Sequence, residues 1–247
     1  HLKIFHQKYK TNLFDYLLWL LLLLNDISTY AQTPIYEGIK VSDIGVSNSI
    51  GKANTSRNIA INKEGIIYIV YRNDAEIRFS KSIDSGQSFL PSILISTINN
   101  TTIEPEIAVN DMGIIFIAWN DLGSVTLSSS NDSGNSFTTP RIIGTQDTNA
   151  DKYGIHISTF ESNLFLVDES GANLYVNINN GNGQFSRRDT DLTLIYADIL
   201  TDREGKTYLS ADNPNVHLFT LSESYNSLTE VAINPLSIIY YSSHTLS

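Results

Sequence analysis

The feature that most constrains the fold is an octapeptide that occurs twice, with the second copy starting 48 positions after the first. It is SIDSGQSF at residues 82–89 and SNDSGNSF at residues 130–137, and both copies fit the pattern S-x-D-x-G-x-x-aromatic. The repeat extends upstream, because IAINKEGIIYIVYRND at residues 59–74 aligns with IAVNDMGIIFIAWND at residues 107–121. A similarity that returns at one period predicts an array of like supersecondary units.

Each unit contains the pattern of four short strands joined by tight turns. In the first repeat Gly65 and Gly86 supply the positive φ that such turns require. The β-branched and aromatic run at residues 66–71 predicts a strand with both faces buried between neighbouring sheets. Pro91 is tolerable only in an edge strand. The four strands are predicted at residues 57–62, 66–71, 76–82 and 89–96. Four antiparallel strands with a period of roughly 45–50 residues are typical of a β-propeller blade.

The same division predicts four blades, at residues 57–96, 104–144, 153–192 and 194–234, with the start of a fifth at 236–247. The last two are degraded: in NINNGNGQF (residues 177–185) Asn179 and Gly181 align with the Asp and Gly of the octapeptide, and SESYNSL (residues 222–228) lacks the Gly. Residues 36–45 are predicted to be an N-terminal strand that closes the ring. Six blades need about 280 residues. We therefore expect a partial, C-terminally truncated ring, with a complete four-bladed ring as the alternative.

The N-terminus has the pattern of a secretory signal peptide. Lys3, Lys8 and Lys10 precede the apolar run LLWLLLLL at residues 17–24, and small residues end at Ala31, where cleavage is predicted. The apolar run is too short to span a bilayer; the alternative is a buried or anchoring helix. We expect domains at residues 1–31 (signal) and 32–247 (propeller), and a bacterial product that is secreted or at the cell surface, with no integral membrane segment after cleavage.

Composition excludes some partners. The chain has no cysteine, which rules out disulfides and thiolate metal sites. Its net charge of −10 and pI near 4.8 disfavour nucleic acid and anionic membranes as partners, since both need clusters of Lys and Arg.

The residue types of the octapeptide favour a structural role. A short carboxylate in a turn accepts hydrogen bonds from backbone N–H groups two or three positions further on, the glycine allows a left-handed backbone, and the aromatic ring can be buried at the blade edge. The residues concerned are Ser82, Asp84, Gly86 and Phe89, and Ser130, Asp132, Gly134 and Phe137. This pattern resembles the Asp-box, or BNR repeat, and over residues 36–247 the chain resembles the sialidase-like β-propeller superfamily. The resemblance implies that the Asp-boxes lie on the face opposite an active site.

The resemblance also implies two candidate catalytic residues. Arg57 stands where that family has a carboxylate-binding arginine, although the aromatic residue and the proline of the family motif are absent. Asp74 stands in the loop that carries the general acid in sialidases. Against catalysis, aspartates fill the same place in the other blades: Asp121, Asp168 and Asp212.

Other constellations are weaker. Asp147, Asn149 and Asp151 begin like a calcium loop, but Lys152 and Ser158 occupy the positions of the Gly and the Glu, which favours a solvated acidic loop and no cofactor. His156 is isolated on a strand and is predicted to be half-buried and hydrogen-bonded.

Two functions follow as hypotheses. The first is a non-catalytic glycan- or protein-binding or scaffold module, which contacts a carbohydrate or a surface protein through loops around Asp74, Asp121, Asp147–Asp151 and Asp168. The second is a glycoside hydrolase of the exo-α-sialidase type, whose remaining active-site residues lie beyond residue 247.

Overall fold

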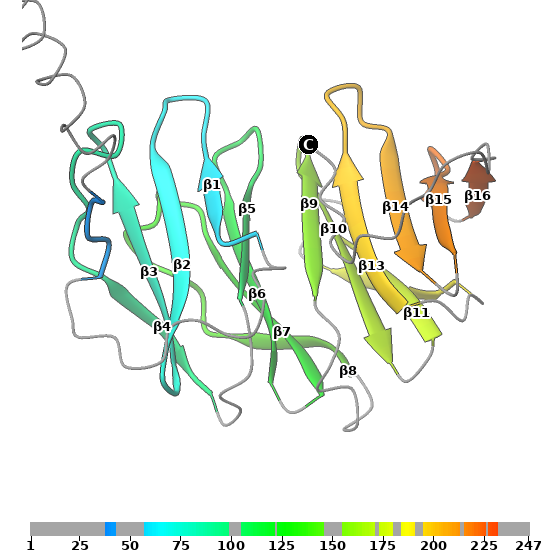
Figure 1. Cartoon of the computed structure of the whole chain (residues 1–247), viewed down its shortest axis with the longest axis horizontal. Coiled ribbons are helices and arrows are strands. Elements are labelled where there is room, and N and C mark those ends of the chain that lie inside the picture. The colour runs from blue at the N-terminus through cyan, green and yellow to red at the C-terminus, as the bar shows by residue number, and fades with distance from the viewer. Residues whose placement is uncertain are drawn as a thin grey trace, which may run out of the picture. The chain divides into compact units, whose positions relative to one another are not determined.

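A computed structural model describes residues 38–42, 57–98, 105–121, 123–145, 155–170, 173–179, 184–190, 195–212, 215–225 and 227–231. Within these ranges every regular element is a β-strand, and none forms a helix of the length and hydropathy needed to span a bilayer. The strands form four antiparallel sheets of four strands each, in sequential order within each sheet (Figure 1). The predicted all-β class with four-stranded antiparallel blades is therefore confirmed.

The strands of each sheet follow one another in the chain. The first sheet contains β1 (Ile59–Ile61), β2 (Ile67–Asn73), β3 (Glu76–Ser82) and β4 (Ile93–Thr97). The second contains β5 (Glu106–Val109), β6 (Ile115–Asp121), β7 (Ser124–Ser130) and β8 (Arg141–Thr145). The third contains β9 (His156–Phe160), β10 (Asn163–Ser170), β11 (Asn173–Asn179) and β12 (Phe185–Asp189). The fourth contains β13 (Ile195–Thr201), β14 (Thr207–Asp212), β15 (Val216–Leu221) and β16 (Leu228–Val231). We call these sheets blades 1 to 4.

Successive blades pack face to face. The inner strands contact one another in turn, β1 with β5, β5 with β9 and β9 with β13. Alternation along β6 explains how one strand serves two interfaces: Ile115 and Ile117 pack toward blade 1, while Phe116 and Ala118 pack toward blade 3. A third cluster of buried residues joins blades 3 and 4. Each blade thus buries apolar residues against its neighbour, which supplies the main stabilisation of such an array.

The prediction that residues 66–71 are buried on both faces is wrong. In β2 only the face with Tyr68 and Val70 is buried, against blade 2, whereas Ile59 and Ile61 of the adjoining β1 are 58% and 61% exposed. No other described sheet packs on the outer face of blade 1. The prediction does hold for β6, because blade 2 lies between two sheets.

Other boundaries differ from the sequence prediction. β4 begins at Ile93 and not at Phe89, because Leu90 N donates to Lys81 O at 2.9 Å as part of the turn, and Pro91, which follows it, has no N–H for the ladder. Of the predicted closing strand, residues 38–42 are described and form no strand. The predicted signal peptide and the predicted fifth blade lie outside the described residues.

The two Asp-box turns are closed by the same hydrogen bonds. Ser82 Oγ donates to Asp84 Oδ1 at 2.7 Å and accepts from Gly86 N at 2.8 Å. Asp84 also accepts from the backbone N–H and the hydroxyl of Ser88, at 2.9 and 2.6 Å. The second turn repeats this arrangement with Ser130, Asp132, Gly134 and Ser136. The residue four positions after the Asp, a Ser in both copies, is therefore an essential partner that the sequence pattern left unassigned.

These hydrogen bonds favour the charged carboxylate. The Ser88 hydroxyl, followed by the Ser82 hydroxyl and the Ser88 N–H, lowers the pKa of Asp84 to about 2. The corresponding bonds, led by the Ser136 hydroxyl, also lower the pKa of Asp132.

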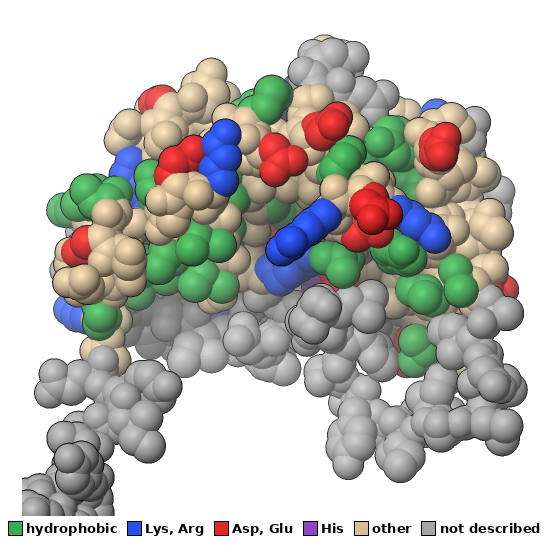
Figure 2. Space-filling view, turned by 90° about the horizontal axis from the view of Figure 1, so that it is seen from above, with side chains coloured by type: hydrophobic (Ala, Val, Ile, Leu, Met, Phe, Trp, Pro, Cys, Tyr) green, Lys and Arg blue, Asp and Glu red, His purple; other side chains and the backbone are tan. Residues whose placement is uncertain are grey.

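The second Asp-box turn also joins blade 2 to blade 1. A Cβ at Gly134, where φ is +75°, would lie 2.6 Å from Cζ of Phe79. The ring of Phe79 meets that of Phe137 edge to face, with centroids 4.8 Å apart. Lys81 Nζ donates to Ser133 O at 2.7 Å and to Asn135 Oδ1 at 2.8 Å. Figure 2 looks onto the end of the blades that carries these turns and shows acidic, basic and apolar side chains intermixed.

Candidate functional site

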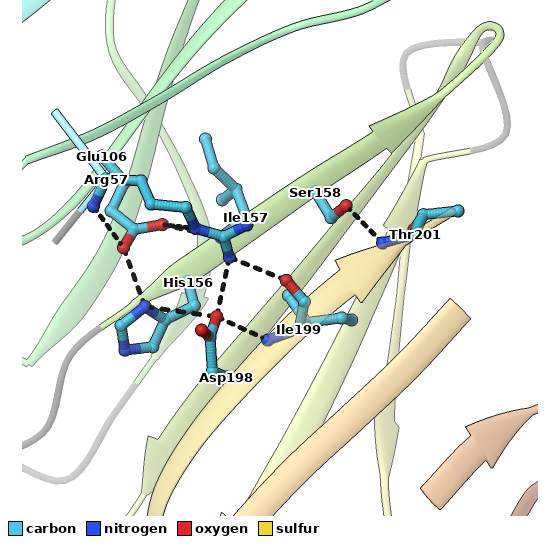
Figure 3. A network of polar contacts seen from close by, with 8 residues as sticks. All are labelled: Arg57, Glu106, His156, Ile157, Ser158, Asp198, Ile199 and Thr201. Atoms are coloured by element: carbon cyan, nitrogen blue, oxygen red, sulfur yellow. Dashed lines mark hydrogen bonds and ion pairs between the residues drawn. The ribbon is translucent and has the colours of Figure 1, made fainter. Parts of the chain in front are cut away.

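A network of ionisable side chains lies along the first part of the inner strands, and each blade contributes one member (Figure 3). Arg57 is two residues before β1, Glu106 is the first residue of β5, and His156 is the first residue of β9. Asp198 comes from β13. Because β1 runs away from this end and β3 runs from it toward the Asp-box turn, the network lies at the opposite end of the blades from the Asp-boxes.

Glu106 is the buried centre of the network. Its side chain is fully buried, and Oε1 accepts from Arg57 N at 3.0 Å while Oε2 accepts from Ile157 N at 2.9 Å. His156 Nδ1 lies 2.8 Å from Oε1. A buried carboxylate is costly unless it is paired and hydrogen-bonded, and these contacts from blades 1 and 3 meet that requirement.

Arg57 reaches from blade 1 to blade 4. Its Nη2 donates to Asp198 Oδ1 and to Ile199 O, both at 2.7 Å, and its Nε lies 4.0 Å from Glu106 Oε2. Asp198 Oδ1 also accepts from Ile199 N at 2.7 Å, which fixes the carboxylate. The Arg57 side chain is 30% exposed. The guanidinium is therefore already engaged with acidic groups of its own chain while part of it still faces solvent.

The surroundings of His156 favour its charged form. Burial opposes the charge, but the neighbouring Glu106 carboxylate and the hydrogen bond to it, together with Asp198 at 3.7 Å, outweigh that cost and raise the pKa of His156. A guanidinium and an imidazole thus face two carboxylates at one point of the fold. Such a group can hold the four inner strands together, and its exposed edge can offer hydrogen bonds to a polar ligand.

Of the two predicted catalytic residues, Arg57 is in the network and Asp74 is not. Asp74 lies in the turn between β2 and β3, with φ at +51° and its side chain exposed. Since β2 ends at this turn, Asp74 and Arg57 occur at the same end of blade 1.

Asp168 does not lie on a loop, and its place in the predicted contact surface is wrong. It is within β10 and fully buried, because the strand continues to Ser170. Arg187 Nη2 donates to Asp168 Oδ1 at 2.8 Å, and Asn177 donates to the other oxygen. The Arg187 guanidinium also lies 4.0 Å from the centroid of the Tyr175 ring. Asp168 is therefore a paired interior charge of blade 3, and only Asp121 and Asp212, at the ends of β6 and β14, keep positions comparable with Asp74.

The prediction that His156 is half-buried and hydrogen-bonded is confirmed, but the sequence patterns assigned three members of the network to no site. Glu106, His156 and Asp198 each directly precede an Ile that pairs with a middle strand in the same register: Ile107 with Ile117, Ile157 with Leu166, and Ile199 with Leu209. One sequence feature could have identified them: the position directly before the inner-strand Ile holds a charged residue or a histidine in three successive repeats.

No group of three or more His, Cys, Asp or Glu side chains that could hold a metal ion occurs among the described residues. The predicted calcium ligands Asp147, Asn149 and Asp151 lie outside them.

Comparison with known proteins supports the fold. The solved structure of the Hadza microbial sialidase Hz136 superposes with a TM-score of 0.50 at 14% identity, over 72% of this chain and 47% of that one. A mutant of the NanB sialidase from Streptococcus pneumoniae gives 0.48 at 15% identity, over 69% and 28%, and the leech intramolecular trans-sialidase gives 0.46 at 13%, over 62% and 27%. The matched part of this chain thus corresponds to about half of the Hz136 chain and to less than a third of each of the other two chains. No family model and no curated protein matches the sequence. The four packed four-stranded blades and the superposition on Hz136 together show that the chain has the fold of a sialidase-like β-propeller.

Proposed function

We propose that this chain is part of an exported, non-catalytic propeller that serves as a glycan- or protein-binding or scaffold module. One observation carries the proposal: the guanidinium of Arg57, the candidate carboxylate binder, is engaged by Asp198 and the Ile199 carbonyl of the same chain. An arginine that captures a substrate carboxylate presents a free two-pronged set of donors. In this network Arg57 instead neutralises acidic groups from blades 2 and 4.

The contact surface we propose is the end of the blades that carries the network. It includes the turns at Asp74 and Asp121 and the exposed part of Arg57. Carboxylates accept hydrogen bonds from sugar hydroxyls and from protein N–H groups, and an exposed guanidinium donates them. Such turns on a rigid scaffold are a common location for binding residues.

Two measurements on the whole protein test this proposal. We expect no release of 4-methylumbelliferone from its sialic acid conjugate, and binding to a glycan array or to surface proteins that weakens in the variant Asp74→Asn/Asp121→Asn. The matched control is Glu223→Gln, which removes an exposed carboxylate from the Asp-box end of blade 4 and should leave binding unchanged. Equal loss in the control and the double variant would contradict the proposed surface.

The second candidate is an exo-α-sialidase-type glycoside hydrolase, favoured by the occurrence of Arg57 and Asp74 at one end of blade 1. It requires release of the fluorophore that falls in Asp74→Asn at unchanged thermal stability. That result would replace the binding proposal.

A further inference from the structure

The interface between blades 2 and 3 is hollow at its Asp-box end. A cavity of about 250 Å³ opens there, and its described lining includes Phe116, Leu127, Ser129 and Arg141 of blade 2 and Ser162 and Asn179 of blade 3. Met112, in the turn between β5 and β6, lies at its rim and is 61% exposed. This end is opposite the Arg57 network, so the cavity is separate from the proposed contact surface.

The repeat explains why the cavity forms here. Leu127 pairs with Ala118 as Phe79 pairs with Val70, and Ser129 pairs with Phe116 as Lys81 pairs with Tyr68. Blade 2 therefore has a smaller side chain at each of the two positions where blade 1 contacts the neighbouring Asp-box turn through Phe79 and Lys81. The space that these two side chains fill at the first interface is left open at the second.

The third repeat also lacks the Asp-box sequence that forms the turn at the first interface. Asn179 pairs with Leu164 as Ser130 pairs with Ile115, so Asn179 occupies the place of the first Ser of the octapeptide and not that of its Asp, which corrects the sequence alignment. The position lacks the hydroxyl that binds the Asp and Gly in the other two turns. The cavity thus lies next to the repeat in which the Asp-box sequence is degraded.

The chemistry of the lining is that of an anion site with an apolar floor. Phe116 and Leu127 are 5% and 3% exposed and form the floor, whereas Ser129, Ser162 and Asn179 supply uncharged hydrogen-bonding groups. Arg141 projects from the same face as its partner Leu127, and its guanidinium lies 5.1 Å from the centroid of the Phe185 ring. Within the described part of the chain no acidic residue lines the cavity and no ion pair engages Arg141.

We propose that this cavity binds a small organic carboxylate with a single apolar ring or a body of similar size. The carboxylate pairs with Arg141, whose planar donors suit two oxygens and whose position over Phe185 reduces the entropy lost on binding. The body covers Phe116 and Leu127. The volume is below the roughly 300–1,000 Å³ that hold drug-sized ligands, which favours a ligand of about ten non-hydrogen atoms, and we expect a Kd on the order of a millimolar.

The sequence provides a reporter for the test, because Met112 is its only methionine. The whole protein, labelled at the methionine methyl carbon and freed of any initiator residue, gives one methyl resonance at the rim of the cavity. Cyclohexanecarboxylate is the probe, and cyclohexanecarboxamide is its uncharged counterpart of the same shape. We expect a saturable shift with the acid and none with the amide over the same concentration range.

Three variants complete the experiment. Arg141→Gln should weaken binding of the acid about tenfold or more. Leu127→Phe/Ser129→Leu, which restores bulk at the places of Phe79 and Lys81 without added charge and without a second methionine, should abolish it. Arg203→Gln, which removes an exposed cation in the turn between β13 and β14, should bind as the parent does. If the filled variant does not fold, the comparison of acid and amide in the parent and in Arg141→Gln decides alone. An equal response to acid and amide, an unchanged affinity in Arg141→Gln, or no saturable shift with either probe would overturn the proposal.

Discussion

Replacement of Gly134 by alanine tests whether packing of the second Asp-box turn against blade 1 stabilises the fold. At φ of +75° a Cβ costs about 1 kcal/mol through backbone strain alone. The same Cβ would lie 2.6 and 2.7 Å from two ring carbons of Phe79 and 3.2 Å from Ile115 Cδ1. Relief by ring movement is restricted, because Phe79 is 1% exposed and stacks on Tyr68 while meeting Phe137 edge to face. Overpacking of this kind costs a further ~1–3 kcal/mol.

The expected loss in unfolding free energy for Gly134→Ala is therefore about 2–4 kcal/mol, or a decrease in Tm of about 4–16 °C for a chain of this length. Gly65→Ala is the matched control, since its φ is +81° but no atom lies within 4 Å of the added Cβ. That variant should lose only about 1 kcal/mol. The assay is urea unfolding followed by the fluorescence of Trp119, which is buried in the same apolar cluster as Phe79.

A second substitution separates the two contributions. Phe79→Leu places in blade 1 the residue that blade 2 has at Leu127, and it should make room for the new methyl group. The loss in Gly134→Ala/Phe79→Leu should then be smaller than the sum of the single losses by about 1–3 kcal/mol. If Gly134→Ala and Gly65→Ala lose equal stability, or if the double variant is additive, the turn does not brace blade 1 and the argument fails.

Three further predictions concern charge. Arg57→Met should lower the unfolding free energy by about 1–3 kcal/mol, less than for a fully buried pair because Arg57 is 30% exposed, and Asp198→Asn should recover part of the loss in a double-mutant cycle. The pKa of His156 is raised above its ordinary 6.5, so the stability that this residue contributes is fully present below pH 6.5 and is lost as pH rises through its pKa in the folded state. Unfolding experiments from pH 6 to 9 should show this decline in the parent protein and not in His156→Gln. The pKa of Asp84 is lowered from 3.8 to about 2, so the stability that this residue contributes is present above pH 3.8 and is lost as pH falls toward 2. Acid unfolding of Asp84→Asn should therefore show a shallower dependence on pH. An unchanged dependence would mean that the hydrogen bonds from Ser82 and Ser88 do not stabilise the turn.

The sequence predicted the parts of the fold that repeat. The octapeptide and the glycine turns gave the strand order and the phase of the first two blades, because these residues have backbone tasks that any copy of the unit must perform. It failed where a residue depends on a neighbouring blade. The half-buried outer face of β2 follows from the lack of a described sheet beside blade 1, and the burial of Asp168 follows from Arg187 of the same sheet, 19 positions along the chain. Neither effect can be predicted from the local sequence of the strand concerned.

Electrostatics explains why the residues of the Arg57 network differ from blade to blade and do not repeat. Asn58, Glu106, His156 and Asp198 hold the same place, directly before the Ile of four successive inner strands, and the strands bring these places together. One acidic residue copied into all four blades would gather like charges at a buried point, where repulsion is poorly screened. A low net charge instead requires unlike residues: two carboxylates, a histidine whose pKa they raise, and the adjacent Arg57. Sequence repetition therefore identifies the strands and turns of the blades but not this network. The network is indicated instead by residues that differ at equivalent positions of successive blades.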